Sequence, residues 1–347
     1  MNEILIYGAN GYSAKLIINE MIKKNIKPIL GGRNELKIKS ISSEYKLDYR
    51  IFDLENNSVV EENLSDIHTL LNCAGPFIYT SEILITSCIK TKTNYLDITG
   101  EIPAIQIAWN LNNAAKESGI TILPSVGLDV IPTDCLAKRL SEKLPEATKL
   151  QLGLLSSRGK ISKGTWLATL EAIKRDGKIR RKGKIIDSKI GDMEINFRME
   201  SILFRGISIP WGDVCSAYYS TKIPNIDVFL GLNKIQWKIR YIIPLIRKIL
   251  LIRPLEKLII KIINSCISGP SQKHRDVAET IIWGRISNER KSIEEAYKFD
   301  EGYNLTALGA TECVIKVLRN EVSAGTKTPS LAFGSNFMDM FVKSKLL

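Results

Sequence analysis

The sequence predicts an α/β protein in which a doubly wound parallel sheet carries an inserted α+β domain. Three observations favour this fold class. Over residues 1–125, short apolar runs alternate with amphipathic stretches, the pattern of repeated β-α units. A glycine-containing turn follows the first apolar run, and the rhythm changes near residue 124 before two helical stretches close the chain. We therefore expect one domain from residues 1–125 plus 303–347, with residues 126–302 as the insertion.

The expected elements follow the chain in that order. Helical patterns fall between the apolar runs, as at Ala14–Lys24 and Pro103–Ser118, and connections of this length favour parallel strand pairing. The insertion contains an expected antiparallel region at Lys184–Tyr219. Residues 303–322 predict one helix, and the segment after it predicts a loop and a second helix. The expected strands are Glu3–Tyr7, Lys27–Leu30, Tyr49–Phe52, Thr69–Asn72, Tyr95–Asp97 and Ile120–Leu123.

Length and composition are those of an ordinary globular protein. A chain of 347 residues can bury a sizeable core and most often forms two domains; 44% of its residues are hydrophobic and 25% charged. Residues 1–15 lack a basic stretch followed by an apolar one, and the six cysteines form no C-x-x-C pair. We expect no signal peptide, reduced thiols and a cytoplasmic location. With only two histidines, a His-ligated metal site is not expected.

The net charge of +12 raises the question of an anionic partner. The lysines are spread along most of the chain, and no recognisable nucleic-acid-binding motif accompanies them. We therefore expect no nucleic-acid partner.

The turn after the first strand reads GANGYSA over residues 8–14. In a dinucleotide-binding β-α-β unit, the first glycine permits the tight turn and the second lets the backbone approach a pyrophosphate. The third position must be small, and Ala14 meets that requirement. The following helix would direct its free N–H groups at the phosphates. This turn predicts a phosphate-binding loop with contributions from Gly8, Asn10, Gly11, Tyr12 and Ser13.

The residues after the next strands predict NADP(H) as the cofactor. A site that prefers NAD usually carries an acid about 20 residues past the loop, whereas here Arg33 and Asn34 follow the second strand. A guanidinium suits a 2′-phosphate by charge and by its paired donors. Asp53 ends the third strand, where a carboxylate can accept from the adenine amino group. After the fourth strand, small residues would let the cofactor lie against the backbone; these are Cys73, Ala74, Gly75, Pro76 and Phe77.

At this point the chain resembles the saccharopine dehydrogenase-like oxidoreductases, and most closely the branch that includes the trans-acting enoyl reductases and the eukaryotic saccharopine dehydrogenase-like oxidoreductase. Departures are mild: Ala14 stands where the family often has glycine, and Tyr12-Ser13 where it often has Phe-Thr. The resemblance rests on the order and spacing of several motifs together. They are GANGYSAKLI, GGRN, NCAGPF, YLDITGE, GLDVIPTD, SKGTWLATL, PWGDVCSAYYS, SGPS, EGYNLTA and GTKTPSLAFG.

The resemblance implies a Rossmann domain, an inserted α+β domain, and a substrate cleft between them. It also implies NADP-linked reduction of a hydrophobic substrate, lipid-like or carrier-bound, at a C=C or C=O group. Cleavage of saccharopine is not expected, because its three carboxylates would call for several arginines and the motifs offer acids and hydroxyls instead. By fold analogy, the sheet of the insertion predicts a homodimer.

Polar residues in these motifs are the candidates for proton transfer and substrate contact. Asp97, Glu101 and Asp129 follow the fifth and sixth strands, near the expected nicotinamide position, and are the catalytic candidates. Several candidates have a structural alternative: Asp97 and Thr99 can cap the helix entered at Pro103, and Asp134 suits the first turn of a helix. The substrate-binding candidates are Thr99, Asp134, Thr165 and Asp213, with Ser162 beside them.

Residues 233–268 form a basic amphipathic block that Pro244 and Pro254 are expected to divide into short helices. Glu256 is its only acid, and no apolar run reaches the roughly 18–20 residues that span a bilayer. The block can lie on an anionic membrane surface, cover an acyl chain, or pack on the protein with its lysine heads outward. These alternatives leave two functions open: an NADPH-dependent reductase, or an NADP-binding scaffold at a membrane or lipid surface without turnover.

Overall fold

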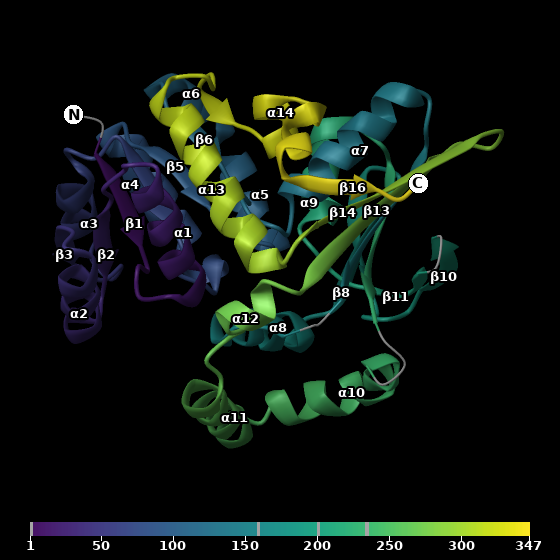
Figure 1. The fold of residues 1–347 in the computed structure, drawn as a ribbon, viewed down its shortest axis with the longest axis horizontal. Coiled ribbons are helices and arrows are strands. Elements are labelled where there is room, and N and C mark those ends of the chain that lie inside the picture. Colours follow the sequence, from purple (N-terminus) through teal and green to yellow (C-terminus); the bar gives the residue numbers. More distant parts are fainter. Residues whose placement is uncertain (1–2, 158–159, 200–201, 233–235) are drawn as a thin grey trace. The chain divides into compact units, whose positions relative to one another are not determined.

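The computed structural model describes residues 3–157, 160–199, 202–232 and 236–347 (Figure 1). The chain divides into two compact units. The first consists of Met1–Ile131 and Tyr303–Gly334, and the second of Pro132–Gly302 and Ser335–Leu347. A parallel sheet with flanking helices in the first unit and a mixed sheet in the second confirm the predicted α/β fold class.

The first unit is built on a seven-stranded parallel sheet. Its strand order reverses at β1, which pairs with β2 on one side and with β4 on the other. All six expected strands are present with small shifts at their ends, and the two-residue strand β15 adds a seventh from the C-terminal part of the chain. In sheet order the strands are β15 (Gly325–Thr326), β6 (Thr121–Leu123), β5 (Asn94–Asp97), β4 (Thr69–Asn72), β1 (Ile4–Tyr7), β2 (Ile29–Gly32) and β3 (Tyr49–Ile51).

The helices of the first unit pack through buried, mostly apolar side chains. Helix α1 buries Ala14, Ile17, Ile18 and Met21, which recur every three or four residues and so share one face. The helix expected at Pro103–Ser118 is two helices that meet at Leu111. The helices are α1 (Tyr12–Lys23), α2 (Glu35–Tyr45), α3 (Asn57–Leu64), η1 (Phe77–Tyr79), α4 (Ser81–Thr91), α5 (Ile102–Asn110), α6 (Asn112–Ser118), α13 (Gly302–Leu318) and α14 (Pro329–Phe333).

Helix α13 packs beside α1 although almost the whole chain separates them in sequence. The Tyr12 and Tyr303 rings meet edge to face with centroids 4.9 Å apart, and the Lys24 ammonium pairs with the Glu312 carboxylate at 2.6 Å. The ring contact joins the first turns of the two helices, and the ion pair joins α13 to the residue that follows the last turn of α1. The helices therefore run parallel, with both N-termini at the same edge of the unit.

The second unit contains a nine-stranded mixed sheet. Strands β7 and β12 pair in parallel, whereas the other pairs are antiparallel. Trp283, Phe204 and Phe229 are fully buried in its core. The strands are β7 (Lys149–Ser156), β8 (Gly177–Arg181), β9 (Lys184–Ser188), β10 (Glu194–Met199), β11 (Ile202–Ser208), β12 (Asn225–Gly231), β13 (Glu279–Ser287), β14 (Ser292–Asp300) and β16 (Val342–Lys345). The helices are α7 (Ile131–Lys143), α8 (Lys163–Lys174), α9 (Asp213–Thr221), η2 (Gln236–Lys238), α10 (Ile239–Leu250), α11 (Arg253–Cys266) and α12 (Gln272–Arg275).

Two expected features of this region differ in the structure. The antiparallel region expected to reach Tyr219 ends with β11, and residues from Asp213 onward form α9. Residues 335–347, which we expected in the first domain as part of a helix, form the 3-10 helix η3 (Ser335–Phe341) and β16 in the second unit. The reason is tertiary: β16 pairs with the edge strand β14, and the Arg139 guanidinium donates to both carboxylate oxygens of Asp339 at 2.7 and 2.8 Å.

The basic block folds as η2, α10 and α11, while residues 233–235 lie outside the described part of the chain. Pro254 begins α11 as expected, but Pro244 lies inside α10 and does not end it. Among the described residues, no helix is long and apolar enough to cross a membrane.

Candidate functional site

The turn between β1 and α1 has the backbone of a phosphate-binding loop. Gly8 adopts a φ of +81°, and its N–H donates to the Gly31 carbonyl oxygen at 2.9 Å. The Gly11 N–H donates to the Gly8 carbonyl oxygen at 2.9 Å, which closes the turn. Helix α1 then begins with Gly11 as its N-cap and with no side-chain cap among the described residues. The N-terminus of α1 therefore lies at the loop, where first-turn N–H groups can bind an anion such as a phosphate.

This loop lies where the strand order reverses, at the carboxyl ends of β1 and β4. Tyr7 pairs with Asn72, and the Cys73 N–H donates to the Tyr7 carbonyl oxygen at 2.8 Å. A Cβ atom placed on Gly8 would lie 2.9 Å from the Cα and N atoms of Ala74, so the two loops touch backbone to backbone. In open α/β sheets, ligands bind in the crevice at this reversal point.

The charges of Arg33 and Asp53, at the ends of β2 and β3, act on the Tyr7 hydroxyl. Burial raises the pKa of Tyr7 to about 12, while the Arg33 charge lowers it and the Asp53 charge raises it. Arg33 is exposed and has no ion-pair partner among the described residues, so its guanidinium is available to a phosphate. Asp53 accepts from the Glu55 N–H at 3.0 Å. The Asn34 side chain caps α2 by accepting from the Lys37 N–H at 3.0 Å.

The loop after β4 is held by a side-chain network. The Asn72 side-chain Oδ1 accepts from the Ala74 N–H at 2.9 Å, and its Nδ2 donates to the hydroxyl oxygens of Thr80 and Tyr95 at 3.0 and 3.1 Å. The Thr80 hydroxyl donates in turn to the Ala74 carbonyl oxygen at 2.9 Å. Burial raises the pKa of the Cys73 thiol well above its usual range, so the thiol stays protonated. Cys73 is therefore suited to line the cofactor crevice and not to act as a nucleophile.

Asp97 is the centre of this network. Its Oδ1 accepts from the N–H groups of Thr99 and Ser125 at 3.0 and 2.8 Å, and its Oδ2 accepts from the Tyr95 hydroxyl at 2.8 Å. The side chain is fully buried, and burial raises the pKa of Asp97 to about 6. Ser125 has a φ of +66°, an unusual backbone for a residue with a side chain. Asp97 thus ties β5 to the segments that follow β5 and β6.

Glu101 ties the end of β5 to the loop after β4. Its Oε1 accepts from the Phe77 N–H at 2.8 Å and its Oε2 from the Ile78 N–H at 3.1 Å. Both donors belong to the first turn of η1, directly after Gly75 and Pro76. Thr99 contributes by accepting from the Glu101 N–H at 3.0 Å. The structure therefore brings Asp97, Thr99 and Glu101 together, although their roles in catalysis stay predictions.

The third catalytic candidate, Asp129, lies half-buried in the loop between β6 and α7. That loop is supported by α13, because the Leu128 N–H donates to the Thr306 hydroxyl oxygen at 3.1 Å. A Cβ atom on Gly127 would lie 3.2 Å from Thr306, so the packing there is close. The helix beginning at Gly302 thus supports the loop that carries Asp129.

The remaining substrate candidates belong to the second unit. Asp213 is buried at the start of α9 and accepts from the Thr133 hydroxyl at 2.8 Å. Asp134 is fully buried in the first turn of α7, next to Thr133. Thr165 is exposed at the start of α8, where its N–H donates to the capping Ser162 hydroxyl at 3.3 Å. Their contacts with substrate stay predictions.

Several residues of these sites escaped sequence reasoning. Tyr95 and Thr80 connect Asn72 with Asp97 and with the Ala74 loop, and Thr133 pairs with Asp213. Tyr303 and Thr306 belong to the motif EGYNLTA, which entered the resemblance but supplied no site residue. For Thr133 and Thr306 the sequence gives no signal of these contacts, because their partners Asp213 and Leu128 lie 80 and 178 positions away. Tyr95 lies two residues from Asp97, and Thr80 lies within eight residues of Ala74 and Asn72; that proximity was the available signal.

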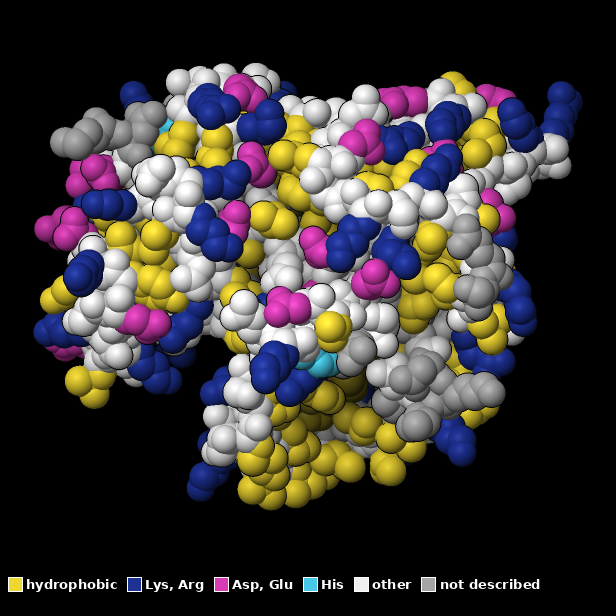
Figure 2. Space-filling model, viewed as in Figure 1, with side chains coloured by type: hydrophobic (Ala, Val, Ile, Leu, Met, Phe, Trp, Pro, Cys, Tyr) yellow, Lys and Arg dark blue, Asp and Glu magenta, His cyan; other side chains and the backbone are white. Residues whose placement is uncertain are grey.

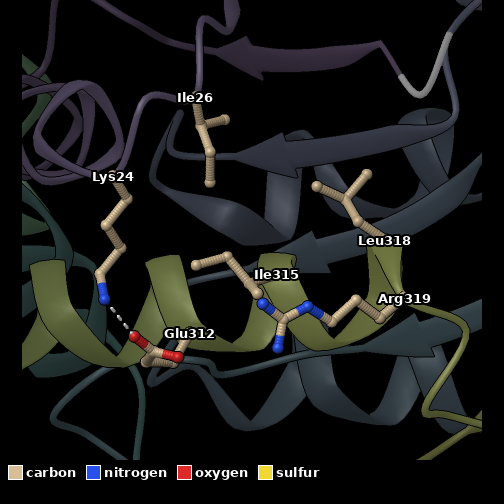
Figure 3. Close-up of a pocket in the computed structure, with 6 residues that line it drawn as sticks. All are labelled: Lys24, Ile26, Glu312, Ile315, Leu318 and Arg319. Carbon is tan, nitrogen blue, oxygen red and sulfur yellow. Dashed lines mark hydrogen bonds and ion pairs between the residues drawn. The ribbon is translucent and has the colours of Figure 1, made fainter.

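A surface depression of about 430 Å³ lies elsewhere in the first unit (Figure 3). Lys24, Ile26, Glu312, Ile315, Leu318 and Arg319 line it. It is at the C-terminal end of α1, whereas the glycine loop is at the N-terminal end. The depression is therefore distinct from the cofactor crevice.

Comparison with known proteins agrees with this geometry. Residues 4–123 match the family model described as the saccharopine dehydrogenase NADP binding domain. The bovine (Bos taurus) saccharopine dehydrogenase-like oxidoreductase is 26% identical over 153 residues, which is 38% of this chain and 35% of that protein. The trans-acting enoyl reductase of Mycobacterium ulcerans is 26% identical over 154 residues, covering 42% of this chain and 36% of that protein. The chain thus spans about a third of the length of these relatives.

The fold likeness extends further than the sequence likeness. The apo saccharopine dehydrogenase (L-Glu forming) of Saccharomyces cerevisiae has a TM-score of 0.67 at 10% identity, with full coverage of both chains. At that identity the likeness shows the fold alone. The sequence match, the glycine turn at the strand reversal and the exposed Arg33 agree on one assignment. Residues 4–123 therefore match the saccharopine dehydrogenase NADP binding domain, and this match supports NADP(H) as the cofactor.

Proposed function

We propose that the protein is an NADPH-dependent reductase that reduces a C=C or C=O group of a hydrophobic substrate, lipid-like or carrier-bound. The observation that carries the proposal is the loop in which Gly8 meets the Ala74 backbone at the strand reversal, with Arg33 exposed nearby. Bound NADPH would supply the hydride, and the protein would supply binding, orientation and a proton. The name of the mycobacterial enoyl reductase supports reduction of a C=C bond.

The residues of this chain have separable tasks in the proposed reaction. Gly8, Gly11 and the first turn of α1 would hold the pyrophosphate, and Arg33 the 2′-phosphate. Asn72 and Glu101 hold the loop after β4, against which the cofactor would lie. Asp97 has a pKa near 6 because it is buried, so it can hold a proton close to neutral pH.

Turnover of saccharopine itself is not part of the proposal. Three buried or half-buried arginines of the second unit already have protein partners: Arg139 pairs with Asp339 and Arg181 with Asp227. Arg180 donates to the carbonyl oxygens of Val214 and Gly183. This supports the expectation that three substrate carboxylates are not the recognised groups.

We expect Arg33→Ala to weaken NADPH binding by about 10- to 100-fold and to leave NADH binding nearly unchanged. The reason is the loss of charge-assisted hydrogen bonds to the 2′-phosphate, each of about 1.5–3 kcal/mol. Fluorescence titration of the wild type and of Arg33→Ala with NADPH and NADH measures the change in affinity. Arg319→Ala is the matched control, because Arg319 is an exposed arginine at the far end of α13. Equal loss of both cofactors, or no loss, would contradict the role of Arg33.

Turnover separates the reductase from the NADP-binding scaffold. We expect hydrophobic enoyl thioesters or ketones to stimulate NADPH oxidation, measured by absorbance, and we expect Gly11→Asp to abolish it by placing a negative side chain against the pyrophosphate. NADPH binding without oxidation by any acceptor of either class would favour the scaffold. Full cellular function of Gly11→Asp would favour it as well.

A further inference from the structure

Helices α10 and α11 carry more apolar surface than the fold covers. One side packs on α8: Leu250 and Ile263 are buried with Leu170, and Ile246 and Ile259 pack beside them. The neighbouring apolar side chains of both helices stay exposed. They are Tyr241, Ile242 and Leu245 on α10, Leu251 and Ile252 in the connection, and Leu255, Leu258 and Ile262 on α11.

The exposed side chains form a continuous strip, which Figure 2 shows as hydrophobic atoms gathered over α10 and α11. Tyr241 is 68% exposed, Leu245 59%, Leu251 64% and Leu258 54%. Leu255, Leu258 and Ile262 recur at helical spacing, so they share one face of α11. Side chains exposed to this extent do not line an enclosed pocket. Contiguous apolar surface of this kind on a soluble domain marks an interaction site.

The charges beside the strip identify its partner. Lys248, Arg253, Lys257 and Lys261 are exposed, and none has an ion-pair partner among the described residues. The one acid of the segment, Glu256, is paired with Lys174 at 2.7 Å. Lysine is depleted in protein–protein interfaces, whereas lysine and arginine beside an apolar helix face are typical of helices that lie on anionic lipid.

We propose that α10 and α11 dock the protein on an anionic bilayer surface. The strip Tyr241–Leu245 and Leu255–Ile262 would enter the boundary between headgroups and acyl chains, with Lys248, Lys257 and Lys261 at the phosphate level. Tyr241 suits this level, because its ring is apolar and its hydroxyl polar. The proposal rests on the second unit alone and is independent of whether the first unit turns over NADPH.

Co-sedimentation of the full chain with vesicles tests the proposal. The vesicles are phosphatidylcholine alone or with about 30 mol% phosphatidylserine, which sets up the negative surface potential. We expect pelleting with the anionic vesicles at about 0.1 M salt and clear weakening at about 0.5 M, where screening is stronger. No pelleting with anionic vesicles at low salt would overturn the proposal.

Two variants separate the charges from the apolar strip. Lys248→Gln/Lys257→Gln/Lys261→Gln should weaken binding to anionic vesicles by on the order of 100-fold, at about fivefold for each lysine. Leu245→Asn/Leu258→Asn/Ile262→Asn should weaken it by at least about 100-fold, because three large apolar side chains no longer leave water. Circular dichroism and NADPH titration of each variant show that the chain is folded.

Matched controls change the same residue types elsewhere. Lys46→Gln/Lys92→Gln/Lys291→Gln and Leu36→Asn/Leu203→Asn alter exposed lysines and leucines outside α10 and α11, and both should pellet like the wild type. Equal loss in the controls would overturn the assignment to these helices. A dimer in analytical ultracentrifugation that Leu258→Asn dissociates, without vesicle binding, would also overturn it and make the strip an interface between copies.

Discussion

Gly8→Ala is expected to weaken NADPH binding by on the order of 100-fold and to destabilise the first unit. A Cβ atom at this position would lie 2.9 Å from the backbone of Ala74, and the φ of +81° disfavours any side chain. The backbone strain costs about 1–2 kcal/mol and the overpacking about 1–3 kcal/mol. If the turn shifts and two charged hydrogen bonds to phosphate are lost, about 3 kcal/mol of binding is lost with them. Urea denaturation and NADPH titration measure the two effects.

Gly119→Ala is the control for backbone strain. Gly119 has a φ of +77°, but nothing lies within 4 Å of a Cβ atom placed there. This variant should therefore lose only the strain term, about 1–2 kcal/mol, and should bind NADPH like the wild type. The difference between the two variants isolates the contact with Ala74. Normal NADPH binding by Gly8→Ala would show that the cofactor does not depend on this turn.

Asp97→Ala is expected to be about 2–6 kcal/mol less stable than Asp97→Asn. Alanine leaves the buried N–H groups of Thr99 and Ser125 without an acceptor, at about 1–3 kcal/mol each. The asparagine carbonyl oxygen keeps both bonds, and the Tyr95 hydroxyl can turn to accept from the new amide. Urea denaturation of both variants at one pH measures the difference. Equal stability would mean that water or a rearranged loop satisfies the two donors.

The pKa of Asp97 also predicts how stability changes with pH. The carboxyl titrates near 3.8 when unfolded and near 6 in the folded protein, because burial disfavours its charge. Between these values the folded state holds the proton and the unfolded state does not, so the free energy of unfolding falls as the pH rises. The loss reaches about 3 kcal/mol near pH 6 and then stays constant. Asp97→Asn lacks this loss, so its stability relative to the wild type should increase from pH 4 to 6. A constant or opposite difference would contradict the raised pKa.

The same asparagine variant separates positioning from proton transfer. If Asp97 only holds the loops, Asp97→Asn keeps both NADPH affinity and kcat. If Asp97 is the general acid that the sequence predicts, kcat falls while NADPH affinity stays. Glu101→Gln tests positioning by Glu101 in the same way. Its amide supplies only one acceptor oxygen for the N–H groups of Phe77 and Ile78, so one of the two hydrogen bonds to η1 is lost.

The first unit was predictable because its signals are local. Each β-α unit is indicated by an apolar run followed by a turn, as at Tyr7–Gly8 and Gly32–Arg33. A helix with apolar residues at helical spacing follows, such as Ala14 to Met21. The cofactor loop is local for the same reason, because the glycines act on their own backbone. The carboxyl ends of parallel strands meet at one edge, so the candidates after β4, β5 and β6 could be assigned to one region from their order alone.

Other features depend on partners that are distant in sequence. Thr133 and Asp213 are 80 positions apart, and nothing near either residue indicates the other. Residues 335–347 have a helical composition, yet β16 pairs with the edge strand β14 of the second sheet. The Arg139 guanidinium holds the same segment by donating to both carboxylate oxygens of Asp339. Pro244 can stay inside α10 because packing of Ile246 and Leu250 on α8 supports the helix beyond it.

The sequence by itself determined the α/β class, the position of the phosphate loop and the choice of NADP(H), since these follow from residue types at fixed short spacings. Only the tertiary structure showed that Asn72, Tyr95, Asp97 and Glu101 form one network, and that an apolar strip on α10 and α11 stays exposed. The physical reason is common to both. Hydrogen bonds and burial are properties of pairs of surfaces, and a side chain's own sequence context does not state which surface it will meet.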